Sequence, residues 1–128
     1  MAERSFFIYP DNNPYFLHES LVVYQRSLQV HDAFDELWGH ERTRCRYARR
    51  IDEASTSLTV NIAEGNGRFS AMDHSHFVSI AEDAGTKLAA YLDLVEAASV
   101  FDADTAKLLL REVMAMLGGL RGYLDAGR

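Results

Sequence analysis

The sequence predicts an all-α fold, an antiparallel up-and-down four-helix bundle in a single domain with a short N-terminal arm. Three observations support this prediction. Apolar residues recur three and four positions apart along most of the chain, which is the spacing of one helix face. The two prolines, Pro10 and Pro14, lie near the N-terminus, so residues from 15 onward lack the strongest helix breaker. Alternation with a period of two, which would indicate strands, is not sustained after Val23.

The chain divides into a short arm and one compact region. Its 128 residues are enough for one hydrophobic core, and we assign 1–14 to the arm and 15–128 to the bundle. The arm contains the apolar run Phe6-Phe7-Ile8-Tyr9 before its prolines. Such an arm folds back on its own bundle, docks on a neighbouring subunit or stays disordered, and the sequence does not choose between these alternatives.

Four apolar seams define the expected helices. The expected bounds are Tyr15 or Ser20 to Trp38, before Gly39; Glu41 to Glu64; Ala71 to Val100; and Ala103 to Asp125, after an Asp102 cap. The seam of the first helix is Leu17, Leu21, Tyr24, Leu28 and His31, with Val23, Val30, Phe34 and Leu37 beside it. The second has Tyr47, Ile51, Ala54, Leu58 and Ile62; the third has Phe77, Ile80, Ala81, Ala84, Leu88, Tyr91 or Leu92, and Val95; the fourth has Leu109, Val113, Met116 or Leu117, Leu120 and Leu124.

Composition indicates a cytoplasmic protein. The single Cys45 excludes an internal disulfide and fits a reducing compartment. No basic-then-apolar leader opens the chain, and no run of about 18 apolar residues predicts a membrane span. We therefore expect no membrane contact.

Basic residues concentrate at the start of the expected second helix, although the net charge is −6. We expect Arg42, Arg46, Arg49 and Arg50 on one side of this helix, with Arg44 pointing elsewhere. One interpretation is phosphate contact with RNA or DNA, which the planar guanidinium suits. The other is a solvated face, or one paired with acids of the third helix or of a neighbouring subunit. The acidic total favours the second interpretation.

The junction between the second and third helices is the most distinctive stretch. Its key residues are Asn61, Glu64, Gly65, Gly67 and Arg68. Gly65 follows the last periodic apolar residue, so we expect a left-handed cap there, with Ser70 as the next N-cap. Glu64 opposes the helix dipole and needs a partner such as Arg68, and Asn61 is placed to hydrogen-bond across the bundle.

These residues also carry a family resemblance. Asn61-Ile62-Ala63-Glu64-Gly65, with Gly67-Arg68 and Ser70 after it, resembles the signature of small bacterial four-helix bundle proteins. This family includes proteins encoded by intervening sequences in bacterial 23S ribosomal RNA genes and the accessory variability protein of diversity-generating retroelements. Further matches are Leu21-Val22-Val23-Tyr24-Gln25, Phe77 with Ile80-Ala81, and Leu88 and Leu92.

The resemblance implies a non-enzymatic protein that assembles with itself. Family members look like ring-forming homo-oligomers, often pentamers, and the retroelement member binds a reverse transcriptase and nucleic acid through a basic surface. We therefore expect a ring-forming adaptor or scaffold that engages a protein or nucleic-acid partner. The basic second helix and the acidic third helix are the expected complementary subunit faces.

A ribonuclease is the alternative. Helical ribonucleases of the HEPN class carry an arginine, four to six residues, then a histidine, and Arg68 with His74 has that spacing. His74 would act as general base and Arg68 would bind phosphate. The same spacing recurs at Arg26 and His31, so the pattern is weakly specific. The histidines show no metal-ligand spacing, and we expect neither a metal nor a cofactor.

Overall fold

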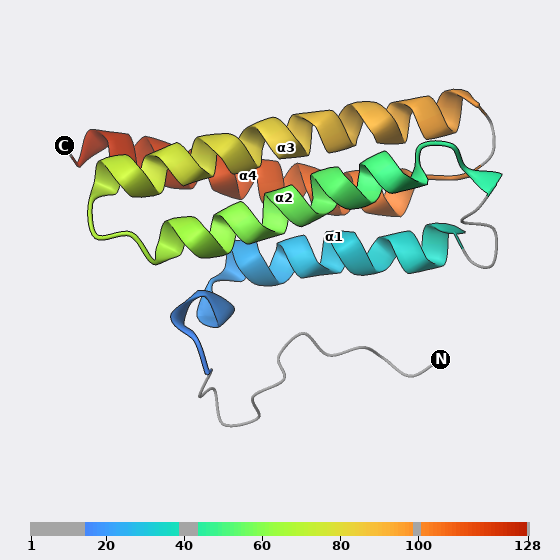
Figure 1. Ribbon diagram of the computed structural model, residues 1–128. Coiled ribbons are helices and arrows are strands. Elements are labelled where there is room, and N and C mark those ends of the chain that lie inside the picture. The colour runs from blue at the N-terminus through green and yellow to red at the C-terminus, as the bar shows by residue number, and fades with distance from the viewer. Residues whose placement is uncertain (1–14, 39–43, 99–100, 128) are drawn as a thin grey trace.

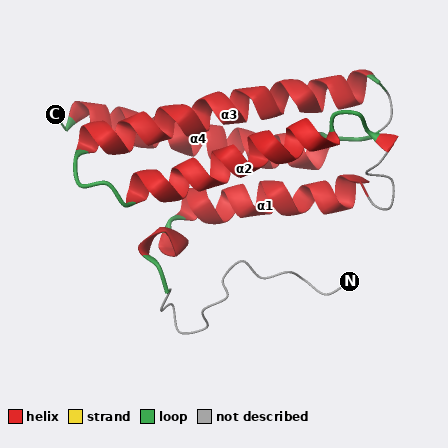
Figure 2. Cartoon of the chain, viewed as in Figure 1, coloured by secondary structure: helices red, strands yellow, loops and turns green. Residues whose placement is uncertain are grey.

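The computed structural model describes residues 15–38, 44–98 and 101–127 (Figure 1). In these ranges the regular elements are all helices and none is a strand (Figure 2). A short 3-10 helix, η1 (Leu17–Ser20), precedes α1 (Val22–Trp38), α2 (Ala48–Asn66), α3 (Ala71–Ala97) and α4 (Asp104–Ala126). The predicted all-α four-helix bundle is confirmed. The N-terminal arm, 1–14, lies outside the described residues.

Successive helices run in opposite directions, and α1 also packs against α4, which closes the bundle (Figure 1). The bundle therefore has two distinct ends. The η1 end carries η1, the turn from α2 to α3 and the last residues of α4. The opposite end carries the start of α2, the last residues of α3 and the start of α4.

The four seams meet in one apolar core. Its fully buried large side chains include Phe34, Ile51, Leu58, Leu88, Leu92 and Leu117. In α3, Val78 is buried while Phe77 and Ile80 are half-buried, and in α4 Leu110 is buried in place of Leu109. Neighbouring positions lie about 100° apart on a helix, so apolar spacing alone does not decide which of two adjacent residues faces the core.

Three members of the first predicted seam, Leu17, Leu28 and His31, lie outside the core cluster, and Leu28 is half-buried. Leu17 belongs to η1 and is exposed, and His31 is exposed while its Nδ1 lies 2.9 Å from the Ser55 hydroxyl. The buried face of α1 is instead the Val23, Val30 and Phe34 side. The chain breaks its helix between Ser20 and Val22, which turns Leu17 away from the face that α1 presents to the core.

The start of α2 differs most from the prediction. The helix begins at Ala48 and not at Glu41, and Arg44 and Arg46 precede it. Its N-cap, Tyr47, makes no side-chain capping bond, and no acid stands in its first turn. Arginines at a helix start oppose the positive end of the helix dipole, so they do not support an earlier beginning.

The helix ends confirm some cap predictions and correct others. Ser70 caps α3, because its Oγ accepts from the Asp73 backbone N–H at 3.0 Å. Gly65 is not a left-handed cap, since α2 continues through Asn66 and ends at Gly67, whose φ is −85°. The third helix ends at Ala97, whereas the predicted Val100 lies outside the described residues. The N-cap of α4 is Ala103 and not the predicted Asp102, although the Asp102 carboxylate accepts from the Asp104 backbone N–H at 3.0 Å.

Within the described ranges, no helix combines the length and apolar character that a membrane span requires.

Candidate functional site

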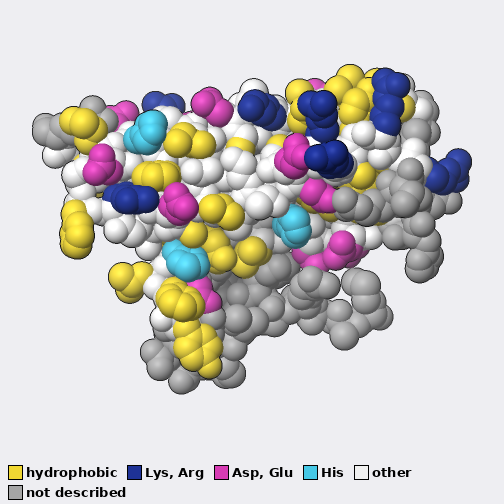
Figure 3. Space-filling model, viewed as in Figure 1, with side chains coloured by type: hydrophobic (Ala, Val, Ile, Leu, Met, Phe, Trp, Pro, Cys, Tyr) yellow, Lys and Arg dark blue, Asp and Glu magenta, His cyan; other side chains and the backbone are white. Residues whose placement is uncertain are grey.

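Basic side chains gather at the opposite end of the bundle, on the face formed by α2 and α3 (Figure 3). We call this group the basic surface; it comprises Arg44, Arg46, Arg49, Arg50 and Lys87. Arg49 and Arg50 lie in the first turn of α2. The prediction that Arg46 shares a helix face with them is wrong, because Arg46 precedes the helix. Arg42, the fourth predicted residue, lies outside the described residues.

Two tyrosines hold the arginines of this surface in place. The Arg46 Nη2 donates to the Tyr47 hydroxyl at 2.7 Å, and its guanidinium carbon lies 4.9 Å from the Tyr47 ring centre. Arg50 interacts with the Tyr91 side chain across the groove between α2 and α3. The tyrosine neighbours raise the pKa of both guanidinium groups, and Glu53 adds to the rise for Arg50. The two tyrosine rings are neighbours, with centroids 6.4 Å apart and planes 34° from parallel.

The tyrosine pair stands between two hollows. A groove of about 390 Å³ runs between α2 and α3, and a hollow of about 370 Å³ lies beside the start of α2. The small side chains of Ala54 and Ala84 are among the residues that line the groove, where larger ones would fill it. The groove reaches Arg50, Lys87 and Tyr91, and the hollow reaches Arg44, Arg46 and Tyr47. An elongated anionic ligand therefore has space beside both tyrosines.

The positive charge of this surface is only partly neutralised by nearby acids. Arg49 pairs with Glu53 at 3.2 Å, but the two side chains are 88% and 63% exposed, so this ion pair is weak and easily replaced. Arg46 donates its hydrogen bond to the Tyr47 phenol, and Arg50 interacts with Glu53 as well as with the Tyr91 phenol. Glu53 and Asp83 line the groove as well, so the positive charge is concentrated at the start of α2.

The junction residues make local contacts. Glu64 pairs with Arg68 at 4.0 Å, as expected from their positions at the end of α2. Asn61 does not reach across the bundle, because its Nδ2 donates to the Ser57 carbonyl at 2.8 Å and lies 3.2 Å from the Ser57 hydroxyl, one turn earlier in the same helix. Arg68 also lies over the Phe77 ring, 4.5 Å from its centre, and so links the turn to α3.

Gly65 lies where α2 and α3 approach closely. A Cβ at this position would stand 2.9 Å from the Phe77 Cβ and 3.0 Å from the His74 Cδ2. The residue is buried and helical, so its function is close packing and not a turn. The sequence shows the glycine but not its neighbours, because both contacting residues belong to the next helix.

Arg68 and His74, the pair proposed for ribonuclease chemistry, both lie near Phe77 and Gly65. Partial burial lowers the pKa of His74, so the ring is neutral at pH 7. Arg68 is already engaged by Glu64 and by the Phe77 ring. In the other pair with this spacing, the Arg26 Nη1 donates to Gln29 at 2.9 Å and His31 contacts Ser55.

The comparison with protein families applies to most of the chain. A family model described as 23S rRNA-intervening sequence protein matches residues 19–120. The chain belongs to the 23S rRNA-intervening sequence protein family. Among curated proteins, none matches the chain. The matched range includes both the junction and the basic surface of this family member.

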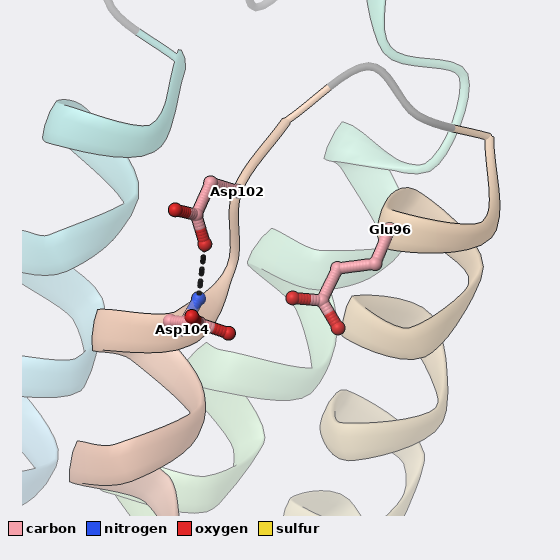
Figure 4. Close-up of side chains that lie close together, drawn as sticks. All are labelled: Glu96, Asp102 and Asp104. Carbon is pink, nitrogen blue, oxygen red and sulfur yellow. Dashed lines mark hydrogen bonds between the residues drawn. The ribbon is translucent and has the colours of Figure 1, made fainter.

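This 23S rRNA-intervening sequence protein also has an acidic cluster that the sequence analysis does not single out. Carboxylate oxygens of Glu96, Asp102 and Asp104 lie within 4.8 Å of one another (Figure 4). The Lys107 ammonium binds Glu96 and also Asp93, the latter at 2.7 Å. Hydrogen bonds to these carboxylates raise the pKa of Lys107. The cluster therefore already contains a cation, and it links α3 to α4.

Proposed function

We propose that this member of the family is a non-enzymatic, cytoplasmic adaptor that assembles as a homo-oligomeric ring, a pentamer by family resemblance, and binds a nucleic-acid or nucleoprotein partner. The observation that supports the nucleic-acid contact is that tyrosines position the guanidinium groups of Arg46 and Arg50 beside two surface hollows. Such arginines are held in position yet keep their charge for a phosphate.

The chemistry of the basic surface suits a nucleic acid better than a small anion. Guanidinium groups bind phosphate oxygens through paired N–H donors, and aromatic rings beside them provide faces on which bases stack. Tyr47 and Tyr91 lie next to both hollows, so a strand that follows the groove meets charge and aromatic surface together. A ring would repeat this surface once per subunit and increase the avidity for a long ligand.

Light scattering coupled to size exclusion, with and without a short RNA duplex, tests the proposal. We expect an assembly several times 14.4 kDa that binds the RNA with an affinity that falls steeply with salt. The double variant Arg46→Gln/Arg50→Gln should weaken binding and reduce the slope of log affinity against log salt by about 2. Arg111→Gln is the matched control, because this exposed arginine lies on α4, outside the basic surface.

The outcomes separate the two parts of the proposal. An assembly that does not bind RNA at low salt contradicts the nucleic-acid contact. The part of the proposal that then stands is a ring that serves as a scaffold for proteins. A plain monomer contradicts the ring. The same mixtures run on denaturing gels test the ribonuclease alternative, in which RNA is cut by the wild type and His74→Ala abolishes the cleavage. Intact RNA in every lane supports the adaptor.

A further inference from the structure

The exposed apolar side chains of the described residues are concentrated at the η1 end. Seven of the ten large apolar side chains that are exposed lie there, and Figure 3 shows hydrophobic groups along this edge of the molecule. They are Tyr15, Phe16, Leu17, Val22, Phe69, Met72 and Tyr123. The remaining three, Val60, Leu94 and Leu108, are scattered over α2, α3 and α4. A concentration of exposed apolar side chains at one end of a molecule is typical of an interaction site.

Two separate groups on different elements make up most of this surface. The η1 patch, defined as Tyr15, Phe16, Leu17 and Val22, surrounds the 3-10 helix and the start of α1. The turn patch, defined as Phe69 and Met72, lies on the connection between α2 and α3 and on the first turn of α3. The two patches therefore differ in their side chains and in the secondary structure that carries them.

The η1 patch rests on a structured base. The Glu19 carboxylate accepts from the Phe16 backbone N–H at 2.6 Å, and the Gln25 side chain donates to the Glu19 carbonyl at 2.8 Å. The His18 ring stands edge-on to Tyr24 of α1, with centroids 4.7 Å apart. These bonds fix η1 to α1 and hold its apolar side chains in solvent.

The turn patch is equally constrained by its neighbours. Phe69 is fully exposed, although Arg68 on one side packs on Phe77 and Ser70 on the other caps α3. Met72 is 61% exposed in the first turn of α3. A phenylalanine held outward by a fixed turn presents apolar surface without the entropy cost of ordering a mobile loop on binding.

The exposed apolar area is a substantial part of what a stable contact between two copies buries. The three aromatic residues of the two patches, Tyr15, Phe16 and Phe69, expose on the order of 400–600 Å² together, taking 150–250 Å² for each complete side chain. A standard interface buries about 1,600 Å² over both partners, and Leu17, Val22 and Met72 add to the aromatic contribution. A second copy of the chain is an occupant that meets this area with apolar surface of its own.

Charge pairing between subunits is less well supported by the structure. Three of the α3 acids expected to face a neighbouring copy are bound within the chain. Glu82 pairs with Arg121 of α4 at 2.5 Å, and Asp93 and Glu96 bind Lys107. These three α3 acids are therefore neutralised by α4, whereas the side chains of the η1 patch and the turn patch are 55% exposed or more.

We propose that the η1 patch of one copy packs on the turn patch of the next copy, and that this apolar contact joins the subunits. A ring needs a heterologous contact between two different surfaces, which these two patches provide at the same end of the bundle. This inference rests on the proposed homo-oligomer and names its contact. It leaves the basic surface, at the opposite end, uncovered on every subunit.

Two double variants test the contact in the full-length chain. Phe16→Ser/Leu17→Ser disrupts the η1 patch by replacing its two central apolar side chains, and Phe69→Ser/Met72→Ser removes the turn patch. Because all four side chains are exposed, both variants should keep wild-type helicity and thermal unfolding. Each alone should sediment as a monomer of 14.4 kDa while the wild type is an oligomer. Leu108→Ser, a change at a 55% exposed leucine of α4, should assemble like the wild type.

Mixing the two double variants distinguishes this contact from other arrangements. The variant without the turn patch retains a working η1 patch, and its counterpart retains a working turn patch. A heterologous contact therefore predicts a one-to-one complex that grows no further. No complex on mixing, or full assembly of either variant alone, overturns the inference while leaving the ring standing. A monomeric wild type overturns the proposed homo-oligomer and this inference together.

Discussion

At the scale of single residues, glycines that look equivalent in the sequence have opposite roles. Gly65 is packed against Phe77 and His74, whereas a Cβ at Gly118, Gly119 or Gly122 in α4 would meet no atom within 4 Å. A glycine inside a helix costs about 1 kcal/mol relative to alanine unless its lack of a side chain is used. Of these four glycines, only Gly65 lies where the lack of a side chain allows another helix to approach closely.

Gly65→Ala is expected to destabilise the protein by roughly 1–3 kcal/mol, because the added methyl group forces α2 and α3 apart at Phe77. Gly119→Ala is the matched control, and it should raise the free energy of unfolding by about 0.5–1 kcal/mol, since the same methyl group enters open space. Urea unfolding followed by circular dichroism measures both. Equal effects of the two substitutions would contradict the packing role of Gly65.

The junction also shows where sequence reasoning about a site succeeds and where it ends. The Glu64–Arg68 pair and the Ser70 cap follow from local spacing, and both are present. The helical conformation of Gly65 does not follow from spacing, because its reason is the close approach of α3. Tyr91 packs against the core as expected and also interacts with Arg50 beside the α2–α3 groove, a contact that depends on the register of two helices.

At the scale of elements, apolar periodicity predicts all four helices and most of their core faces. It fails at the start of the second helix, because apolar spacing has little influence on where a helix begins. The expected second helix begins at Glu41, but α2 begins at Ala48, with arginines in and before its first turn and no side-chain cap at Tyr47. The 3-10 helix is also missed, since its four residues are too few for a periodic pattern.

The start of α3 provides a test at this scale. Ser70→Ala removes the acceptor of the Asp73 N–H, and the cap loss should lower the free energy of unfolding by about 1 kcal/mol. Ser79→Ala in the middle of the same helix is the control, because a mid-helix alanine is at least as favourable as serine. Thermal melts of both variants provide the comparison. A Ser70→Ala variant as stable as the wild type would mean that the cap contributes nothing.

At the scale of the whole molecule, the bundle separates two kinds of surface. Arginines with tyrosine partners occupy one end, and exposed aromatic and aliphatic side chains occupy the other. The net charge of −6 hides this separation, because most acids lie elsewhere on the chain. Composition therefore argues against a nucleic-acid partner, while the arrangement of the same residues supports one. The two surfaces also predict opposite responses to salt.

Sedimentation of the protein from low to molar salt, with and without RNA, measures these responses. Subunits joined through apolar patches should stay assembled, because salt screens charges and does not weaken apolar burial. RNA should dissociate over the same range, since each phosphate contact adds to the salt dependence. Subunits that separate in salt would instead indicate pairing between the basic surface and acids of a neighbouring copy. The arginines would then serve the assembly and not a nucleic acid, and Arg46→Gln/Arg50→Gln would lower the oligomeric mass as well as RNA binding.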